Sequence, residues 1–240
     1  MKLSGQTAVV FGASSGVGLA SAQLLASHGA RLVITGRDKK RLDTVPVEGE
    51  VTRELVDATD YAAVERFFAS VGSFDHLVIP AGATDRGGRF LEQITPQSFR
   101  ATFESKFWPQ MNVAHTGGRY VNKGGSITFF SGGAAHRALE GMTNVAAVNG
   151  AIEAVVGPLA VELAPTRVNV ISPGSLATGY WRGVPDDDRN AIFKRIGDGL
   201  LAGRIGTAED IANAVLFLVT TSFVTGAVLE VDGGLRHSRM

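Results

Sequence analysis

The chain has 240 residues, no cysteine, and 23 basic against 23 acidic residues. The lack of cysteine excludes disulfides, thiolate metal sites and cysteine nucleophiles, and it is compatible with a reducing cytoplasm, where we expect the protein. Zero net charge without a basic run argues against nucleic-acid binding. The first six residues contain no apolar segment of a signal peptide. We also expect no membrane helix, because we find no apolar span of 18 residues. We expect no metal site, because we see no cluster of metal-ligand residues.

Short apolar runs alternate with segments of helical spacing along the whole chain. The predicted strands are Thr7–Phe11, Arg31–Thr35, Val51–Val56, His76–Ile79, Ser126–Phe130, Arg167–Ile171 and Val228–Val231. The predicted helices are Leu19–Ala26, Asp38–Leu42, Asp60–Val71, Thr95 to about Ala114, Asn144–Leu163, about Asp188 to Ile196, and Ala208–Val219. The alternation predicts an α/β fold, a doubly wound parallel sheet of about seven strands in a single domain spanning residues 1–240.

Glycines cluster where the first strand turns into the first helix. They allow a tight turn and let a phosphate approach the backbone without meeting a Cβ atom. The free N–H groups at the helix start and the helix dipole then attract a pyrophosphate. The spacing G-x-x-x-G-x-G differs from the commoner G-x-G-x-x-G. We therefore interpret these glycines as a dinucleotide-binding turn because they lie between a strand and a helix. The residues that we expect to bind a dinucleotide here are Gly12, Ser14, Ser15, Gly16, Val17 and Gly18.

Further landmarks follow the later strands. In chain order the set is Gly12-x3-Gly16-x-Gly18, Asp57, Ala81-Gly82, Ser172-Pro173-Gly174 with Thr178, and Val231-Asp232-Gly233-Gly234. Together they resemble the short-chain dehydrogenase/reductase family over essentially the whole chain. The resemblance implies a Rossmann-type fold that binds a nicotinamide cofactor.

The resemblance also assigns parts of the cofactor to particular loops. Asp57 and Ala58 would border the adenine. Ala81 and Gly82 would pass close to the ribose. Pro173, Gly174 and Thr178 would lie along the nicotinamide and the phosphates. A strand-end turn residue without a ligand is the alternative interpretation of each.

The end of the second strand bears on which cofactor binds. An acidic residue there would hydrogen-bond the ribose 2′-hydroxyl and repel a 2′-phosphate. Here Gly36 holds that place and Arg37 follows, and a guanidinium suits a phosphate by charge and by its forked geometry. The sequence therefore favours NADP(H) and leaves NAD(H) open, since Asp38 lies next door and Arg37 could be a solvated cation.

The chain departs from the family at the residues that normally carry the chemistry. The family uses an Asn, a Ser, a Tyr and a Lys. Aligning the long helix on its Ala-rich segments puts Asn149 at the Lys position and Val145 at the Tyr position. Gly132 falls at the Ser position, with Ser131 just before it, and Lys106 falls at the Asn position.

Lys and Asn thus exchange places between two helices expected to face one pocket. The Lys106 ammonium can reach the volume vacated at Asn149, where it would bind ribose hydroxyls or the substrate oxygen and, once desolvated, donate a proton. A surface lysine in a diverged helix is the alternative. Ser131, His136 and Tyr180 are further candidates at the same mouth, with packing or pocket lining as the alternative role.

Three functions stay open on the sequence. The first is an NADP(H)-dependent oxidoreductase that interconverts a small carbonyl and an alcohol at an atypical site. The second is a non-catalytic NADP(H)-binding protein, either a redox sensor or a partner subunit. The third is a lyase or isomerase on the same scaffold. The expected partners are a small-molecule substrate and, because two helices are apolar beyond what the sheet needs, further copies in a homodimer or homotetramer.

Overall fold

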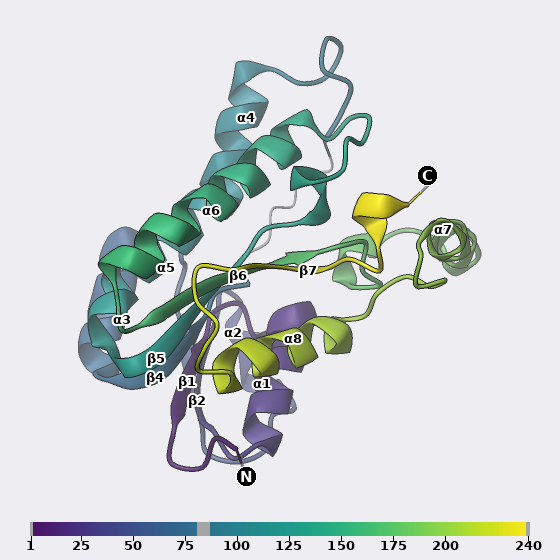
Figure 1. Ribbon diagram of the computed structural model, residues 1–240. Coiled ribbons are helices and arrows are strands. Elements are labelled where there is room, and N and C mark those ends of the chain that lie inside the picture. Colours follow the sequence, from purple (N-terminus) through teal and green to yellow (C-terminus); the bar gives the residue numbers. More distant parts are fainter. Residues whose placement is uncertain (1, 81–86, 239–240) are drawn as a thin grey trace.

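Strands rich in Val, Ile and Leu form the centre of the molecule, because such runs are stable only when both faces of a parallel sheet are covered. The computed structural model describes residues 2–80 and 87–238. The strands are β1 (Thr7–Val10), β2 (Arg31–Gly36), β3 (Val51–Leu55), β4 (Phe74–Val78), β5 (Val121–Phe130), β6 (Arg167–Pro173) and β7 (Val228–Val231). All pair in parallel in the order β3-β2-β1-β4-β5-β6-β7, the doubly wound sheet that the sequence predicts (Figure 1).

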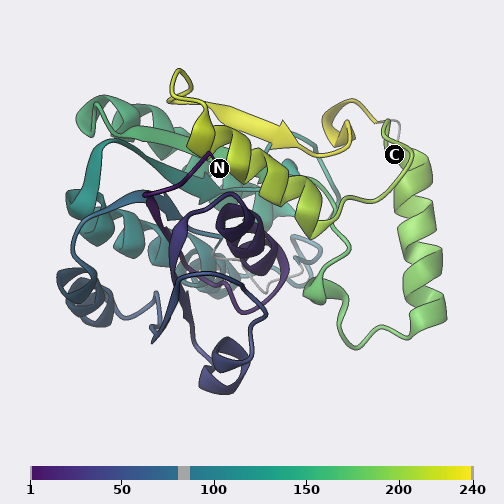
Figure 2. The same ribbon diagram turned by 90° about the horizontal axis from the view of Figure 1, so that it is seen from below.

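Helices cover both faces of this sheet (Figures 1 and 2). The helices are α1 (Gly16–Ser27), α2 (Lys39–Asp43), α3 (Tyr61–Val71), α4 (Pro96–Thr102), α5 (Trp108–Gly117), α6 (Thr143–Glu162), α7 (Asp186–Gly199) and α8 (Ala208–Thr220). One apolar core packs α1 and α8 against one face, and a second packs α3, α5 and α6 against the other. Helix α7 stands away from the sheet in both views.

One long helix predicted from Thr95 to about Ala114 is interrupted in the structure. Helix α4 passes into a π-helical turn, η1 (Phe103–Phe107), before α5 begins. Pro109 has no N–H to donate to the turn before it, so the regular i→i−4 ladder cannot run through this point. The wider turn buries Lys106, which the regular periodicity did not predict.

Helix α6 also differs from expectation. It is long and apolar enough to cross a membrane by length and composition alone, whereas the sequence analysis found no such span. The difference arises because Ala, Val and Leu outweigh its few polar residues. In the structure α6 packs against β5, β6 and the turn η3 (Gly133–Ala135), and its Asn144 and Asn149 side chains are buried.

A buried histidine lies in the centre of the sheet. His76 of β4 is 3% exposed, with Nδ1 2.9 Å from Ser126 Oγ and Nε2 3.1 Å from Gln6 Oε1. The neutral ring satisfies both contacts when Nε2 carries the proton. Burial lowers its pKa from 6.5 to about 4; nearby Asp75 opposes that shift and Arg167 adds to it.

We expect this histidine to make the fold acid-sensitive. Below pH 6.5 His76 binds a proton in the unfolded chain, whereas in the folded chain it stays neutral down to about pH 4. The free energy of unfolding should therefore fall by about 3 kcal/mol between pH 6.5 and pH 4. Below pH 4 His76 should cause no further change. Denaturant titrations from pH 7 to pH 4 should show a shallower loss in His76→Gln than in the exposed control His237→Gln. Equal slopes in the two variants would contradict the assignment.

Candidate active site

The glycine turn after β1 is built as an open cradle. Gly12 and Gly16 have φ of +71° and +55°, which L side chains rarely adopt. A Cβ on Gly18 would lie 2.3 Å from the Gly12 carbonyl oxygen, so the turn closes only with glycine there. Ser15 is the N-cap of α1, yet its side chain makes no capping hydrogen bond and the first turn holds no acidic residue. The first amides of α1 are therefore not capped by a side chain, which suits an anionic ligand.

Other loops at the same edge of the sheet face this cradle. A Cβ placed on Gly16 would lie 4.0 Å from Thr178 Cβ, in the loop after β6. Gly174, where that loop begins, donates to the Val231 carbonyl at 3.1 Å. After β3, Asp57 Oδ1 accepts from the amide and hydroxyl of Thr59, which orders the turn. These loops all follow the carboxyl ends of parallel strands, the edge at which ligands bind in a doubly wound sheet.

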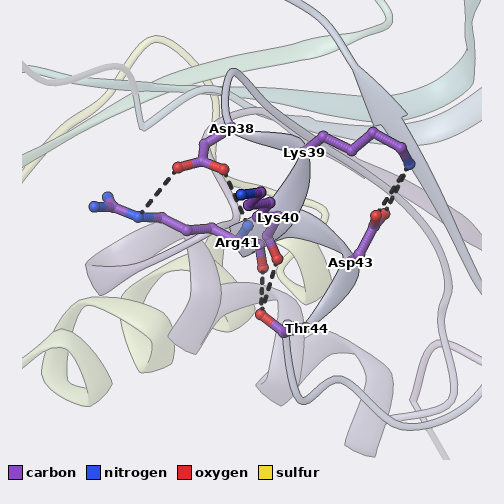
Figure 3. Close-up of polar contacts among 6 residues, drawn as sticks. All are labelled: Asp38, Lys39, Lys40, Arg41, Asp43 and Thr44. Atoms are coloured by element: carbon purple, nitrogen blue, oxygen red, sulfur yellow. Dashed lines mark hydrogen bonds and ion pairs between the residues drawn. The ribbon is translucent and has the colours of Figure 1, made fainter.

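Helix α2 carries the cations Lys39, Lys40 and Arg41 (Figure 3). It follows Gly36, where a Cβ would lie 3.5 Å from Ser14 Cβ in the glycine turn. Asp38 caps the helix by accepting from the Arg41 amide at 3.1 Å and also contacts Arg41 Nε at 3.4 Å. Lys39 pairs with Asp43 at 3.0 Å. Arg37 is exposed, and no ion pair joins it to the described residues. Asp38, the acidic residue because of which NAD(H) remained an alternative, thus interacts with its own helix.

A buried ammonium lies where β5 ends. Lys106 is 9% exposed, and its Nζ donates to the Ser131 carbonyl and to Asn149 Oδ1, both at 2.7 Å. The alternative of a surface lysine is therefore wrong. Burial lowers the pKa of Lys106 from 10.5 to about 8, while the charge of Glu153 opposes that fall. Near neutral pH this ammonium is charged and still able to release a proton.

The Asn149 amide lies against Gly132, in the space that a side chain at position 132 would occupy. A Cβ on Gly132 would lie 2.9 Å from Asn149 Nδ2. The backbone at Gly132 is extended, with φ 171°, so glycine is not needed there for conformational reasons. Val145 lies one turn before Asn149 on α6 and is half-buried. Lys106, Asn149 and Gly132 thus pack against one another in one arrangement.

A carboxylate continues the cluster toward solvent. Ser131 Oγ donates to Glu153 Oε1 at 2.6 Å. His136 Nε2 lies 2.9 Å from Glu153 Oε2, although off the line of a hydrogen bond. The His136 and Glu153 side chains are 19% and 10% exposed. The structure therefore brings four sequence candidates together: Lys106, Ser131, His136 and Asn149.

Some candidates are not placed beside this cluster. Ala81 and Gly82 lie outside the described residues, as does the side chain of Tyr180. Two residues of the cluster were missed. Gln110 clamps the end of β5, since its amide nitrogen donates to the Phe130 carbonyl at 2.9 Å and its oxygen accepts from the Phe130 amide at 2.8 Å. Glu153 is an acidic residue inside an Ala- and Val-rich helix, one turn after Asn149, and that spacing was an available signal.

Known proteins resemble the chain over nearly its full length. A family model described as enoyl-(acyl carrier protein) reductase matches residues 12–236. The 3-oxoacyl-(acyl-carrier-protein) reductase FabG of Chlamydia muridarum is 31% identical over 246 residues, covering 96% of this chain and 97% of the relative. L-xylulose reductase of Mesocricetus auratus is 31% identical over 240 residues, covering 97% of each.

A solved structure agrees with these relatives in fold. The crystal structure of a small-chain dehydrogenase in complex with NADPH is 35% identical, covers 96% of this chain and 98% of that one, and superposes with a TM-score of 0.82. Together with the parallel sheet and the glycine cradle, these matches show that the chain belongs to the short-chain dehydrogenase/reductase family, whose members are oxidoreductases that bind a nicotinamide cofactor.

Proposed function

We propose that the protein is an NADP(H)-dependent oxidoreductase that interconverts a small carbonyl and an alcohol at an atypical site. One juxtaposition carries the proposal: the uncapped glycine cradle and the buried Lys106 ammonium lie at the same edge of the sheet. The open turn of Gly12, Gly16 and Gly18 fits a pyrophosphate, because no Cβ or capping side chain fills it.

In this proposal each group has one task. The cofactor, when bound, supplies or removes a hydride at the carbonyl carbon. Lys106 donates the proton that the carbonyl oxygen needs to become a hydroxyl, and takes it back in the reverse direction. Asn149 and the Ser131 carbonyl hold the ammonium in position through their 2.7 Å hydrogen bonds. The lowered pKa of about 8 supports a proton donor that works near neutral pH.

The preference for NADP(H) rests on Arg37. Its exposed guanidinium follows the end of β2, while Asp38 is engaged by Arg41 and by the cap of α2. A small-chain dehydrogenase of similar structure binds NADPH. A charge-assisted contact between Arg37 and a 2′-phosphate would distinguish the two cofactors.

We also propose a cytoplasmic homo-oligomer, a dimer or a tetramer. Less than a third of the most apolar stretch of α6 is buried within the chain, and Val161 on that helix is 79% exposed. Trp108 at the start of α5 is 48% exposed. A second copy would cover these apolar side chains. The lack of cysteine supports a reducing compartment.

Removing the Arg37 guanidinium should weaken NADPH selectively. We expect Arg37→Ala to raise the Kd for NADPH about 10- to 100-fold and to change that for NADH by less than about twofold. Titration of cofactor fluorescence measures both. Arg31→Ala is the matched control, because Arg31 is exposed at the opposite end of the same strand. Equal weakening of both cofactors, or of neither, would count against a 2′-phosphate at Arg37.

Removing the Lys106 ammonium should slow the reaction. We expect Lys106→Met, close in length and uncharged, to lower kcat for NADPH-dependent carbonyl reduction about 10²- to 10⁴-fold. Lys123→Met, at an exposed position of β5, is the control. An unchanged rate in Lys106→Met rules out the proton donor. Tight NADPH binding without turnover of any carbonyl or alcohol by the parent protein would favour the non-catalytic binding protein, to which Gly132 and Val145 point.

Restoring the family's serine should not restore the family's arrangement. Gly132→Ser puts an atom against the Asn149 amide, which Lys106 holds in place. We expect a loss of about 1–3 kcal/mol in the free energy of unfolding, relieved in part by adding Asn149→Ala. Gly157→Ser, on α6 with open space around its Cβ, is the control for the substitution itself. Additive losses in the double variant would show that the two positions do not interact.

A further inference from the structure

Glu153 is the acidic residue of the buried cluster and has no role in the function proposed above. It lies on α6 one turn after Asn149, with its side chain 10% exposed. Oε1 accepts from the Ser131 hydroxyl at 2.6 Å, and Oε2 lies 2.9 Å from His136 Nε2, off the line of a hydrogen bond. A carboxylate this deeply buried is costly unless it is hydrogen-bonded and faces an opposite charge.

Ser131 links the Glu153 carboxylate to the opposite charge, which is the Lys106 ammonium. The Ser131 carbonyl accepts from Lys106 Nζ at 2.7 Å, while the Ser131 hydroxyl donates to Glu153. The ammonium and the carboxylate are therefore bound to opposite ends of the same serine. In a site shielded from water their attraction is stronger than the same separation would give at the surface.

Other charged groups near Lys106 face solvent. Arg100 on α4, Glu104 within η1 and His115 on α5 are exposed, and no hydrogen bond or ion pair joins them to Lys106. His136, after η3, contacts the carboxylate and not the ammonium. Among the described residues, Glu153 is the charged group that acts on the pKa of Lys106, raising it against the effect of burial.

We propose that Glu153 is a positioning residue that acts through Lys106: its carboxylate, hydrogen-bonded to Ser131, is the counter-charge that keeps the Lys106 ammonium charged inside the site. The catalytic consequence of this charge interaction rests on the proposed function, whereas the interaction itself does not. Without the carboxylate the buried ammonium would lose its proton at a lower pH, and a proton donor to the substrate oxygen would be lost with it.

The direct test follows the titration of Lys106 in the full chain. Only six lysines occur in the sequence, so lysine labelled with ¹³C at Cε gives a simple NMR spectrum. The Lys106 signal is assigned by its loss in Lys106→Met. Its midpoint is expected near pH 8 in the parent protein. In Glu153→Gln, which keeps an acceptor for Ser131 and removes the charge, we expect the midpoint to fall by about one pH unit.

The controls separate charge from packing. Glu162→Gln makes the same change at an exposed position of the same helix, and it should leave the midpoint where it is. A midpoint in Glu153→Gln within about 0.2 pH unit of the parent overturns the proposal. If Glu153→Gln does not fold, Glu153→Met decides, because it also removes the charge and keeps a side chain of similar length. A fall in the Lys106 midpoint supports the proposal, and an unchanged midpoint overturns it.

Kinetics separate this proposal from the function on which its consequence rests. If the protein reduces carbonyls, the high-pH limb of its kcat profile should move to lower pH in Glu153→Gln together with the NMR midpoint. An NMR shift without a matching kinetic shift overturns the part of the proposal in which Glu153 supports the proton donor. An NMR shift in a protein that turns over no carbonyl supports the charge interaction between Glu153 and Lys106 and rules out the reductase function.

Discussion

Parallel strands can be joined only by crossover connections, and seven of them in one sheet bring all their carboxyl ends to a single edge. Everything of functional interest in this molecule depends on that constraint. The glycine cradle follows β1, the cation-rich helix follows β2, and Ser131 and Gly174 follow β5 and β6. These segments are far apart in the sequence and meet because the direction of each strand is the same.

Around this edge the buried polar side chains form one connected arrangement. A long side chain from η1 crosses to α6, where an amide receives it, and the amide in turn occupies the space beside a glycine. Each member explains another: Lys106 needs acceptors, Asn149 and the Ser131 carbonyl provide them, and Gly132 makes room. Buried polar groups left unpaired cost free energy, and the Lys106 ammonium and the Asn149 amide oxygen satisfy each other here.

The π-helical turn explains why this arrangement is accessible to the chain. Pro109 interrupts the ladder of hydrogen bonds between α4 and α5, and the wider turn directs Lys106 into the molecule. Gln110 then fastens α5 to the end of β5 by two hydrogen bonds to Phe130. The segment after the lysine is thus attached to the sheet, and the ammonium itself is held by its two hydrogen bonds of 2.7 Å.

The sequence by itself determined the fold class, the order of the elements and the family, because periodicity and glycine turns are local properties of the chain. It also predicted that Lys106 and Asn149 face one pocket, and the structure joins these two side chains by a hydrogen bond. Only the tertiary structure decided which side chains meet. The sequence did not predict Glu153 and Gln110 as part of the cluster, because their partners come from other segments of the chain. A regular helical pattern also could not predict the π-helical turn that buries Lys106. Burial, pairing and pKa are properties of the packed molecule, which no single segment contains.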